Sequence, residues 1–138
     1  MSERLRILEA WKTRLETTGY PVALGSVEAL GPDDPKQALL IVPGDDQVKA
    51  QGNKVFVSLP LTIFALAEAD LEKPWEAVET MLAAIKTAVE TEDHRLNDAL
   101  KRPIDRGHTR TVPRDPGSTT VGAAITYQCG YEETWGTP

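Results

Sequence analysis

The sequence has little of the residues on which most metal centres and many active sites depend. Cys129 is the only cysteine among 138 residues, so an intrachain disulfide and a multi-cysteine zinc site are both excluded. The two histidines, His94 and His108, have no second histidine or cysteine at ligand spacing, and both lie in polar segments typical of a solvated surface. We therefore expect no metal site, no cofactor and no catalytic residue.

Long hydrophobic runs and an excess of positive charge are lacking as well. No segment approaches the roughly 20 consecutive apolar residues of a membrane-spanning helix. The N-terminus is charged and lacks the apolar core that a signal peptide has. With 15 basic and 21 acidic residues the net charge is −6, which disfavours binding to phosphates or to anionic lipid. We expect a protein of a cytosol-like compartment, with no membrane partner.

Motifs that carry chemistry are also missing. The segment Gly117 to Thr120 lacks the lysine and the spacing of a phosphate-binding loop, and no Gly-x-Ser-x-Gly elbow occurs. Cys129 falls on the apolar face of a predicted strand, which favours a buried small side chain over a nucleophile. Neighbouring acidic residues are expected to point to solvent rather than to share an acid–base site; they are Asp33 and Asp34, Asp45 and Asp46, and Glu132 and Glu133.

Two helices are predicted from apolar residues at helical spacing. Ser2 is a suitable N-cap for a first helix from about Glu3 to Thr18, which Gly19 and Pro21 end. Pro74 is well placed to begin a second helix, which extends to about Thr91. The apolar stripe of the second helix comprises Trp75, Val78, Met81, Leu82, Ile85, Ala88 and Val89.

The remaining apolar segments indicate strands. A weak strand is expected between Tyr20 and Leu30, broken near Gly25, and a buried strand from Ala38 to Val42, followed by a polar loop through Gly52 and Asn53. Alternating apolar residues predict strands over Lys54 to Phe64 and Val121 to Glu132. Pro60 cannot donate to a ladder, which places its strand at an edge or predicts a bulge there. The expected fold class is α+β, a single domain over residues 1–138, with a mainly antiparallel sheet and two principal helices packed against it.

The charged tract between Glu92 and Gly117 is predicted to hold a short helix at about Leu96 to Lys101, followed by a long mobile loop around residues 103–120. Positive charge gathers there in an otherwise acidic chain, and an aromatic residue follows the last strand. We expect these residues to contact a neighbouring subunit, the alternative being a solvated loop: Arg106, Arg110, Arg114 and Trp135.

The order of these elements resembles the tail terminator proteins of long-tailed phages, also called minor tail or tail completion proteins. The resemblance covers most of the chain and is carried by patterns rather than by catalytic signatures. These patterns are the first helix ending in Thr18-Gly19-Tyr20-Pro21, the alternating strand Val55 to Ile63, the helix that begins Pro74-Trp75, and the closing strand Ile125 to Glu132 running into Trp135-Gly136-Thr137-Pro138.

The resemblance implies a structural virion protein and not an enzyme. Such a protein assembles into a homohexameric ring, docks on the last ring of the tail tube protein, ends tube polymerisation and presents a surface to the head–tail connector protein. It is located in the virion tail, and in the host cytoplasm during assembly. DNA is expected to pass through its pore without specific binding, and an acidic chain suits that passage because like charges repel.

Other functions remain open at this point. A head–tail joining protein of the neck is the nearest alternative, and electron microscopy of tails made without the protein separates the two by tube length. A small-ligand-binding or enzymatic α+β domain would need a pocket of converging polar groups with perturbed pKa values. Specific nucleic-acid recognition would need salt-sensitive DNA binding, which the net charge disfavours.

Overall fold

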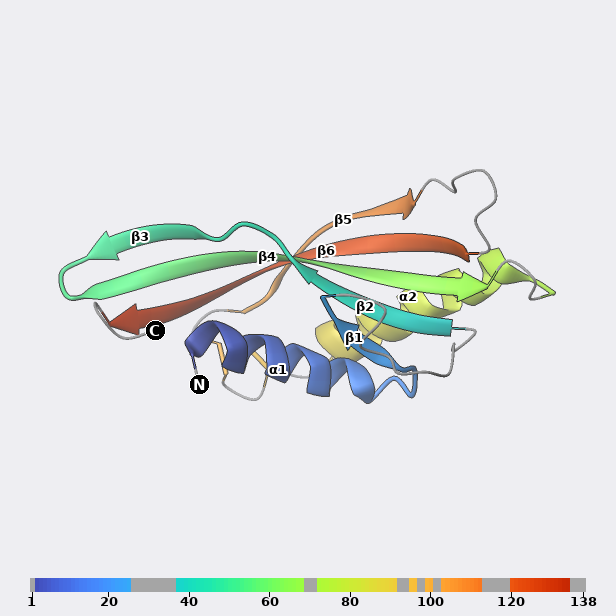
Figure 1. Ribbon diagram of the computed structural model, residues 1–138, viewed down its shortest axis with the longest axis horizontal. Coiled ribbons are helices and arrows are strands. Elements are labelled where there is room, and N and C mark those ends of the chain that lie inside the picture. The colour runs from blue at the N-terminus through green and yellow to red at the C-terminus, as the bar shows by residue number, and fades with distance from the viewer. Residues whose placement is uncertain are drawn as a thin grey trace.

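The computed structural model describes residues 2–25, 37–68, 72–91, 95–96, 99–100, 103–112 and 120–134. These residues form two helices and a six-stranded sheet (Figure 1). The elements are α1 (Glu3–Glu16), β1 (Val22–Leu24), β2 (Gln37–Pro43), β3 (Gln47–Gln51), β4 (Lys54–Glu68), α2 (Pro74–Glu90), β5 (Asp105–Val112) and β6 (Thr120–Thr134).

Two long antiparallel strands, β4 and β6, form the axis of the sheet. They pair over their whole length, from Lys54 opposite Thr134 to Glu68 opposite Thr120. The strand order is β1-β2-β4-β6-β5, and β3 pairs with β4 beyond the end of β2. Among the described strands, β1 and β2 are the only pair that runs parallel. The predicted α+β class, with a mainly antiparallel sheet, is confirmed.

Both helices begin and end where the sequence indicates. The Ser2 hydroxyl accepts a hydrogen bond from the Leu5 amide at 3.1 Å, as an N-cap does. Gly19 follows α1 with φ of 89°, a conformation that glycine adopts without strain. Trp75 was expected in the buried stripe of α2, but it is 46% exposed because it lies in the first turn, at the margin of the buried arc.

One face of the sheet packs on the helices and forms the core. Because side chains alternate along a strand, the odd-numbered residues of β4 from Val55 to Ala67 and of β6 from Val121 to Tyr131 are buried on this face. They join Trp11 of α1 and Met81 of α2 in one hydrophobic cluster. The rings of Trp11 and Tyr127 lie 5.5 Å apart, so α1 packs directly over the middle of β6.

The position of Pro60 corrects part of the prediction. Its strand is central rather than at an edge, since β4 has partners on both sides. The predicted bulge lies in the segment that joins β2 to β3. The three residues between Pro43 and Gln47 stand there opposite two residues of β4. Gly44 donates its amide to the Pro60 carbonyl there at 2.8 Å. Pro60 has no amide hydrogen to donate, and it lies opposite the junction between β2 and β3, where the regular strand pairing is interrupted.

Two segments predicted as loop contain strands. The polar loop before Gly52 contains the strand β3, and the predicted mobile loop contains the strand β5 from Asp105 to Val112. The short helix predicted at about Leu96 to Lys101 lies partly outside the described residues, and Leu96 itself has φ of 51°, which is not a helical value. Polar, exposed sequences form both strands because each has an alternating neighbour to pair with, and this pairing is invisible in their own composition.

Candidate assembly surface

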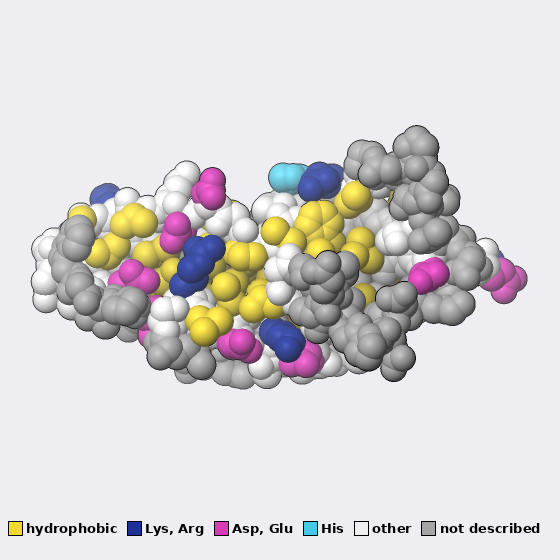
Figure 2. All heavy atoms as spheres, in the orientation of Figure 1, with side chains coloured by type: hydrophobic (Ala, Val, Ile, Leu, Met, Phe, Trp, Pro, Cys, Tyr) yellow, Lys and Arg dark blue, Asp and Glu magenta, His cyan; other side chains and the backbone are white. Residues whose placement is uncertain are grey.

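The face of the sheet away from the core cluster is covered by neither described helix. It carries the even-numbered residues of β4, which are all half-buried from Phe56 to Glu68, and those of β6. Apolar members of this face include Phe56, Pro60, Phe64 and Leu66. Figure 2, which has the orientation of Figure 1 with α1 in view, shows hydrophobic side chains across the middle of the visible surface, interrupted by charged side chains of both signs. The half-buried apolar side chains of this helix-free face make it a candidate contact surface.

At one end of the molecule the sheet narrows to a ribbon of three strands, β3, β4 and β6. The strand β5 begins at Asp105, which pairs with Gln128. The part of β6 from Gly130 to Thr134 therefore has no strand beside it among the described residues. On the other side of the ribbon all five residues of β3 are exposed. We call these two borders the β6 edge and the β3 edge. Unpaired edges of this kind are sites at which another strand can add.

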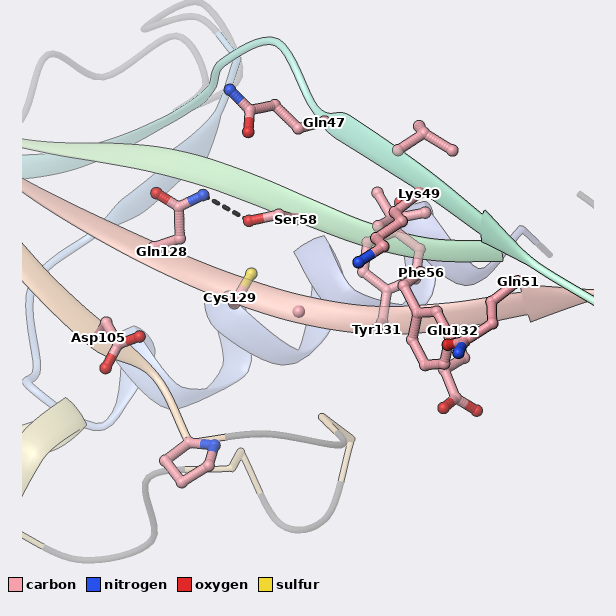
Figure 3. Close-up of a pocket in the computed structure, with 14 residues that line it drawn as sticks. Gln47, Lys49, Gln51, Phe56, Ser58, Asp105, Gln128, Cys129, Tyr131 and Glu132 are labelled. Carbon is pink, nitrogen blue, oxygen red and sulfur yellow. Dashed lines mark hydrogen bonds between the residues drawn. The ribbon is translucent and has the colours of Figure 1, made fainter. Parts of the chain in front are cut away.

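A hollow of about 680 Å³ lies on the ribbon between these edges. Its floor includes Phe56 and Ser58 of β4 with Gln128 of β6, and the Gln128 amide nitrogen donates to the Ser58 hydroxyl. Figure 3 shows these two side chains pointing toward one another, with Asp105 beside β6. The lining combines an aromatic ring with amides and both signs of charge. Among the described residues no three His, Cys, Asp or Glu side chains gather as metal ligands do.

Two of the three arginines singled out in the sequence, Arg106 and Arg110, lie on β5. The Arg106 guanidinium Nε lies 3.5 Å from a Glu90 carboxylate oxygen, and the other oxygen accepts a 2.8 Å hydrogen bond from the Tyr127 hydroxyl. The Arg110 guanidinium lies 5.8 Å from the centre of the Phe64 ring, on the helix-free face. Both side chains thus have partners within the chain. Arg114 and Trp135 lie outside the described residues.

The positions of the cysteine, the histidines and the acidic pairs were predicted only in part from the sequence. Cys129 is buried as expected, its thiol lies 3.6 Å from the Leu59 carbonyl, and burial raises the pKa of the thiol to about 11. His108 is exposed on β5, whereas His94 lies outside the described part of the chain. Among the acidic pairs, Asp45 and Asp46 are exposed as expected.

Glu132 and Glu133, which were expected to point to solvent, lie half-buried on β6. Glu132 forms an ion pair with Lys54 at 3.7 Å. Glu133 and Asp46 contribute, after burial, to raising the pKa of the Tyr131 hydroxyl to about 12. The strand continues through these acids because the pairing with β4 extends to its first residue, Lys54.

The sequence around Lys49 did not predict that this residue lies on a strand. This side chain lies in the row Lys49–Phe56–Glu132 across β3, β4 and β6, on the helix-free face. A positive charge therefore stands at the β3 edge and a negative charge at the β6 edge. Only the hairpin signal of Gly52, whose φ is 64°, could have revealed the strand before it.

Comparisons with known proteins add no family to this description. The sequence matches no protein-family model, and no curated protein matches it significantly. In the described residues, no helix combines the length and the apolar character needed to cross a membrane.

Proposed function

We propose that this chain is a structural subunit that assembles with copies of itself into a ring and acts as a tail terminator. In this role the ring caps the tail tube of a long-tailed phage, stops its polymerisation and offers a surface for head attachment. The observation that carries the proposal is the three-stranded ribbon, neither of whose edges pairs with another strand in the described part of the chain. An isolated monomer leaves the backbone groups of both edges to water, whereas a neighbouring copy can pair with them.

The helix-free face supports the same proposal. Phe56 and Phe64 lie on it only partly buried, and the hollow between the edges gives the face a shape that a partner can fill. The tail terminator role in particular comes from the resemblance of the sequence pattern, and the head–tail joining protein is the neighbouring alternative within the same structural class.

The experiment uses light scattering to measure the mass of the full chain over a range of concentrations, alone and with purified tail tubes. We expect a mass several times that of the 15.1 kDa chain, or assembly on the tubes. Electron microscopy of tails made without the protein then separates the two roles. Overlong tubes support a terminator, and tails of normal length without heads support a joining protein. A chain that stays monomeric in both conditions contradicts the proposal.

A further inference from the structure

We infer that the β3 edge of one copy pairs with the β6 edge of the next, in parallel, so that the sheet continues from subunit to subunit. This inference rests on the proposed self-assembly and adds to it which edges meet, in which direction and in which register. The partner is a second copy of this chain.

The outward backbone groups of the β6 edge follow from one hydrogen bond. Because the Pro60 carbonyl accepts from Gly44, it points toward the β2–β3 side of β4. Successive residues of a strand point their backbone groups to opposite sides, so Leu59 faces β6 and its partner Cys129 faces β4. Gly130, Glu132 and Thr134 must then direct their amides and carbonyls away from β4, into the unpaired edge.

The same alternation defines the β3 edge. Gln47, Lys49 and Gln51 pair with even-numbered residues of β4, whose backbone groups face β3. Val48 and Ala50 therefore direct their amides and carbonyls outward. Val48 is 60% exposed, so neighbouring side chains leave this edge open.

The topology fixes the direction in which two copies can join. Both β3 and β6 are antiparallel to β4, so they run in the same direction within one chain. A second copy placed beside the first in the same orientation brings its β3 parallel to β6. In a parallel pair, a residue that hydrogen-bonds across the junction stands beside one that bonds away from it. This rule lets Glu132 stand beside Gln47, Lys49 or Gln51 of the second copy, and we choose Lys49, which lies with Glu132 on the helix-free face, because of its charge.

Charge and length agree with this pairing. The β3 edge carries Lys49 and the β6 edge carries Glu132, whose carboxylate also lies 3.7 Å from Lys54 of its own chain, so pairing of unlike edges gives this carboxylate a second positive neighbour. Pairing of two β3 edges or of two β6 edges brings like charges together, which is unfavourable across strands. The strand β3 has five residues, and six residues of β6 lie beyond Gln128, its last backbone pair with β5, so the unpaired stretch is long enough to hold β3.

The shape of the sheet allows copies to join in this way. The sheet has five strands at the end that holds β1 and β5, and three at the ribbon. Copies joined at their ribbons must therefore diverge at their wider ends, where β5 of one copy and both β1 and β2 of the next lie between them. A wedge-shaped subunit with unlike edges is what a closed cyclic assembly requires.

Disulfide cross-linking tests the pairing and its register. In a Lys49→Cys/Glu132→Cys variant the two thiols of one chain are separated by Phe56, about two strand spacings or ~9.6 Å, too far for a disulfide. Across the inferred junction they stand about one spacing apart. We expect oxidation to give a ladder of covalent dimers and larger species on a denaturing gel. The wild-type chain, whose only thiol is buried, should give none.

A matched variant tests the register. Lys49→Cys/Gly130→Cys shifts one thiol by two residues along the same edge, at a position where a Cβ lies 3.7 Å from its nearest atom, the Val57 carbonyl oxygen, and so fits. We expect its cross-linking yield to fall severalfold below that of Lys49→Cys/Glu132→Cys.

Charge reversal tests the same contact without new thiols. Lys49→Glu and Glu132→Lys, each alone, should raise the concentration for half-maximal assembly roughly 2–10-fold, since each places like charges at every junction. An equimolar mixture of the two variants should assemble as the wild type does, because alternating copies restore opposite charges at every junction.

The outcomes distinguish this inference from the proposed function. If the wild type assembles while Lys49→Cys/Glu132→Cys yields no cross-linked ladder and the mixture of charge variants gains nothing, the edge pairing is wrong and self-assembly stands. If the wild type remains monomeric with and without tail tubes, both are wrong. A ladder together with recovery in the mixture supports the pairing.

Discussion

The strands β2 and β3 lie on the same flank of β4, one after the other, yet they differ in almost every property. The strand β2 reads QALLIVP and buries Ala38, Leu39 and Ile41, whereas β3 reads QVKAQ and buries nothing. Both are antiparallel to β4. The difference lies on their other side: β2 has β1 beside it and faces the core cluster, while β3 borders solvent.

This contrast shows that one sheet serves two purposes along its length. At the wide end the flanking strand completes a hydrophobic core, and its composition follows from burial. At the ribbon the flanking strand is held by backbone pairing alone and keeps its other edge open. An open edge that carries a lysine resists indiscriminate pairing and still accepts a partner edge of opposite charge.

The largest effect on the free energy of unfolding is expected when a side chain on β2 is truncated to alanine, and the matched truncation on β3 is the comparison. Ile41→Ala on β2 removes a fully buried side chain and should lower the free energy of unfolding by about 2–5 kcal/mol. Val48→Ala on β3 should change it by less than about 0.5 kcal/mol, because the side chain is 60% exposed. Urea denaturation of both variants, at a concentration where the chain is monomeric, measures the difference. Similar losses would show that β3 is part of the folded core.

A smaller effect compares the two tyrosines of β6. Tyr127→Phe removes the hydroxyl that donates to Glu90 and should cost about 1–2 kcal/mol, a range lowered because that carboxylate is partly exposed. Tyr131→Phe, at the ribbon, serves as the matched control and should cost less. Denaturation midpoints at pH 7 measure both. An equal loss would remove the energetic distinction between the wide end and the ribbon.

Alkaline pH should destabilise the chain. Burial raises the pKa of Cys129 from 9.0 to about 11 and that of Tyr131 from 10.0 to about 12. It also raises the pKa of Tyr127, which donates to Glu90. For groups whose folded pKa is raised, stability is fully present below the unfolded pKa and is lost as pH rises through the folded one. Unfolding free energy should therefore decline from about pH 9.

A variant sharpens the alkaline prediction. In Cys129→Ala the group with the lowest unfolded pKa is absent, so the decline should begin nearer pH 10, where the tyrosines take over. Thermal melts between pH 7 and pH 11 for both proteins give the two onsets. Identical onsets would show that the Cys129 thiol does not couple to folding.

The smallest expected effect concerns the arginines of β5. Arg106→Gln and Arg110→Gln should each change the free energy of unfolding by less than about 1 kcal/mol, since an exposed ion pair and a cation–π contact contribute little. Both should also assemble as the wild type does if the ribbon edges carry the contact. Light scattering measures assembly, and its loss in either variant would move the subunit contact from the ribbon to β5.

Much of the fold could be predicted because its strongest signals are local. Alternation alone identified β6, and Ser2, Gly19 and Pro74 marked helix boundaries that the structure confirms within two residues. The candidate surface could not be found in the same way. The strands β3 and β5 are polar and exposed, and they exist because β4 and β6 are long enough to pair with them. The charge of Lys49 matters for the inferred contact only because Glu132 lies on β6, a strand far away in sequence.

The sequence by itself determined that the chain folds with two amphipathic helices against alternating strands, because side-chain periodicity selects which face is buried. Only the tertiary structure decided that Pro60 lies in a central strand, that Arg106 meets Glu90, and that the sheet narrows to a ribbon with two open edges. Those features depend on which strands pair, and pairing is settled by contacts between residues distant in the chain.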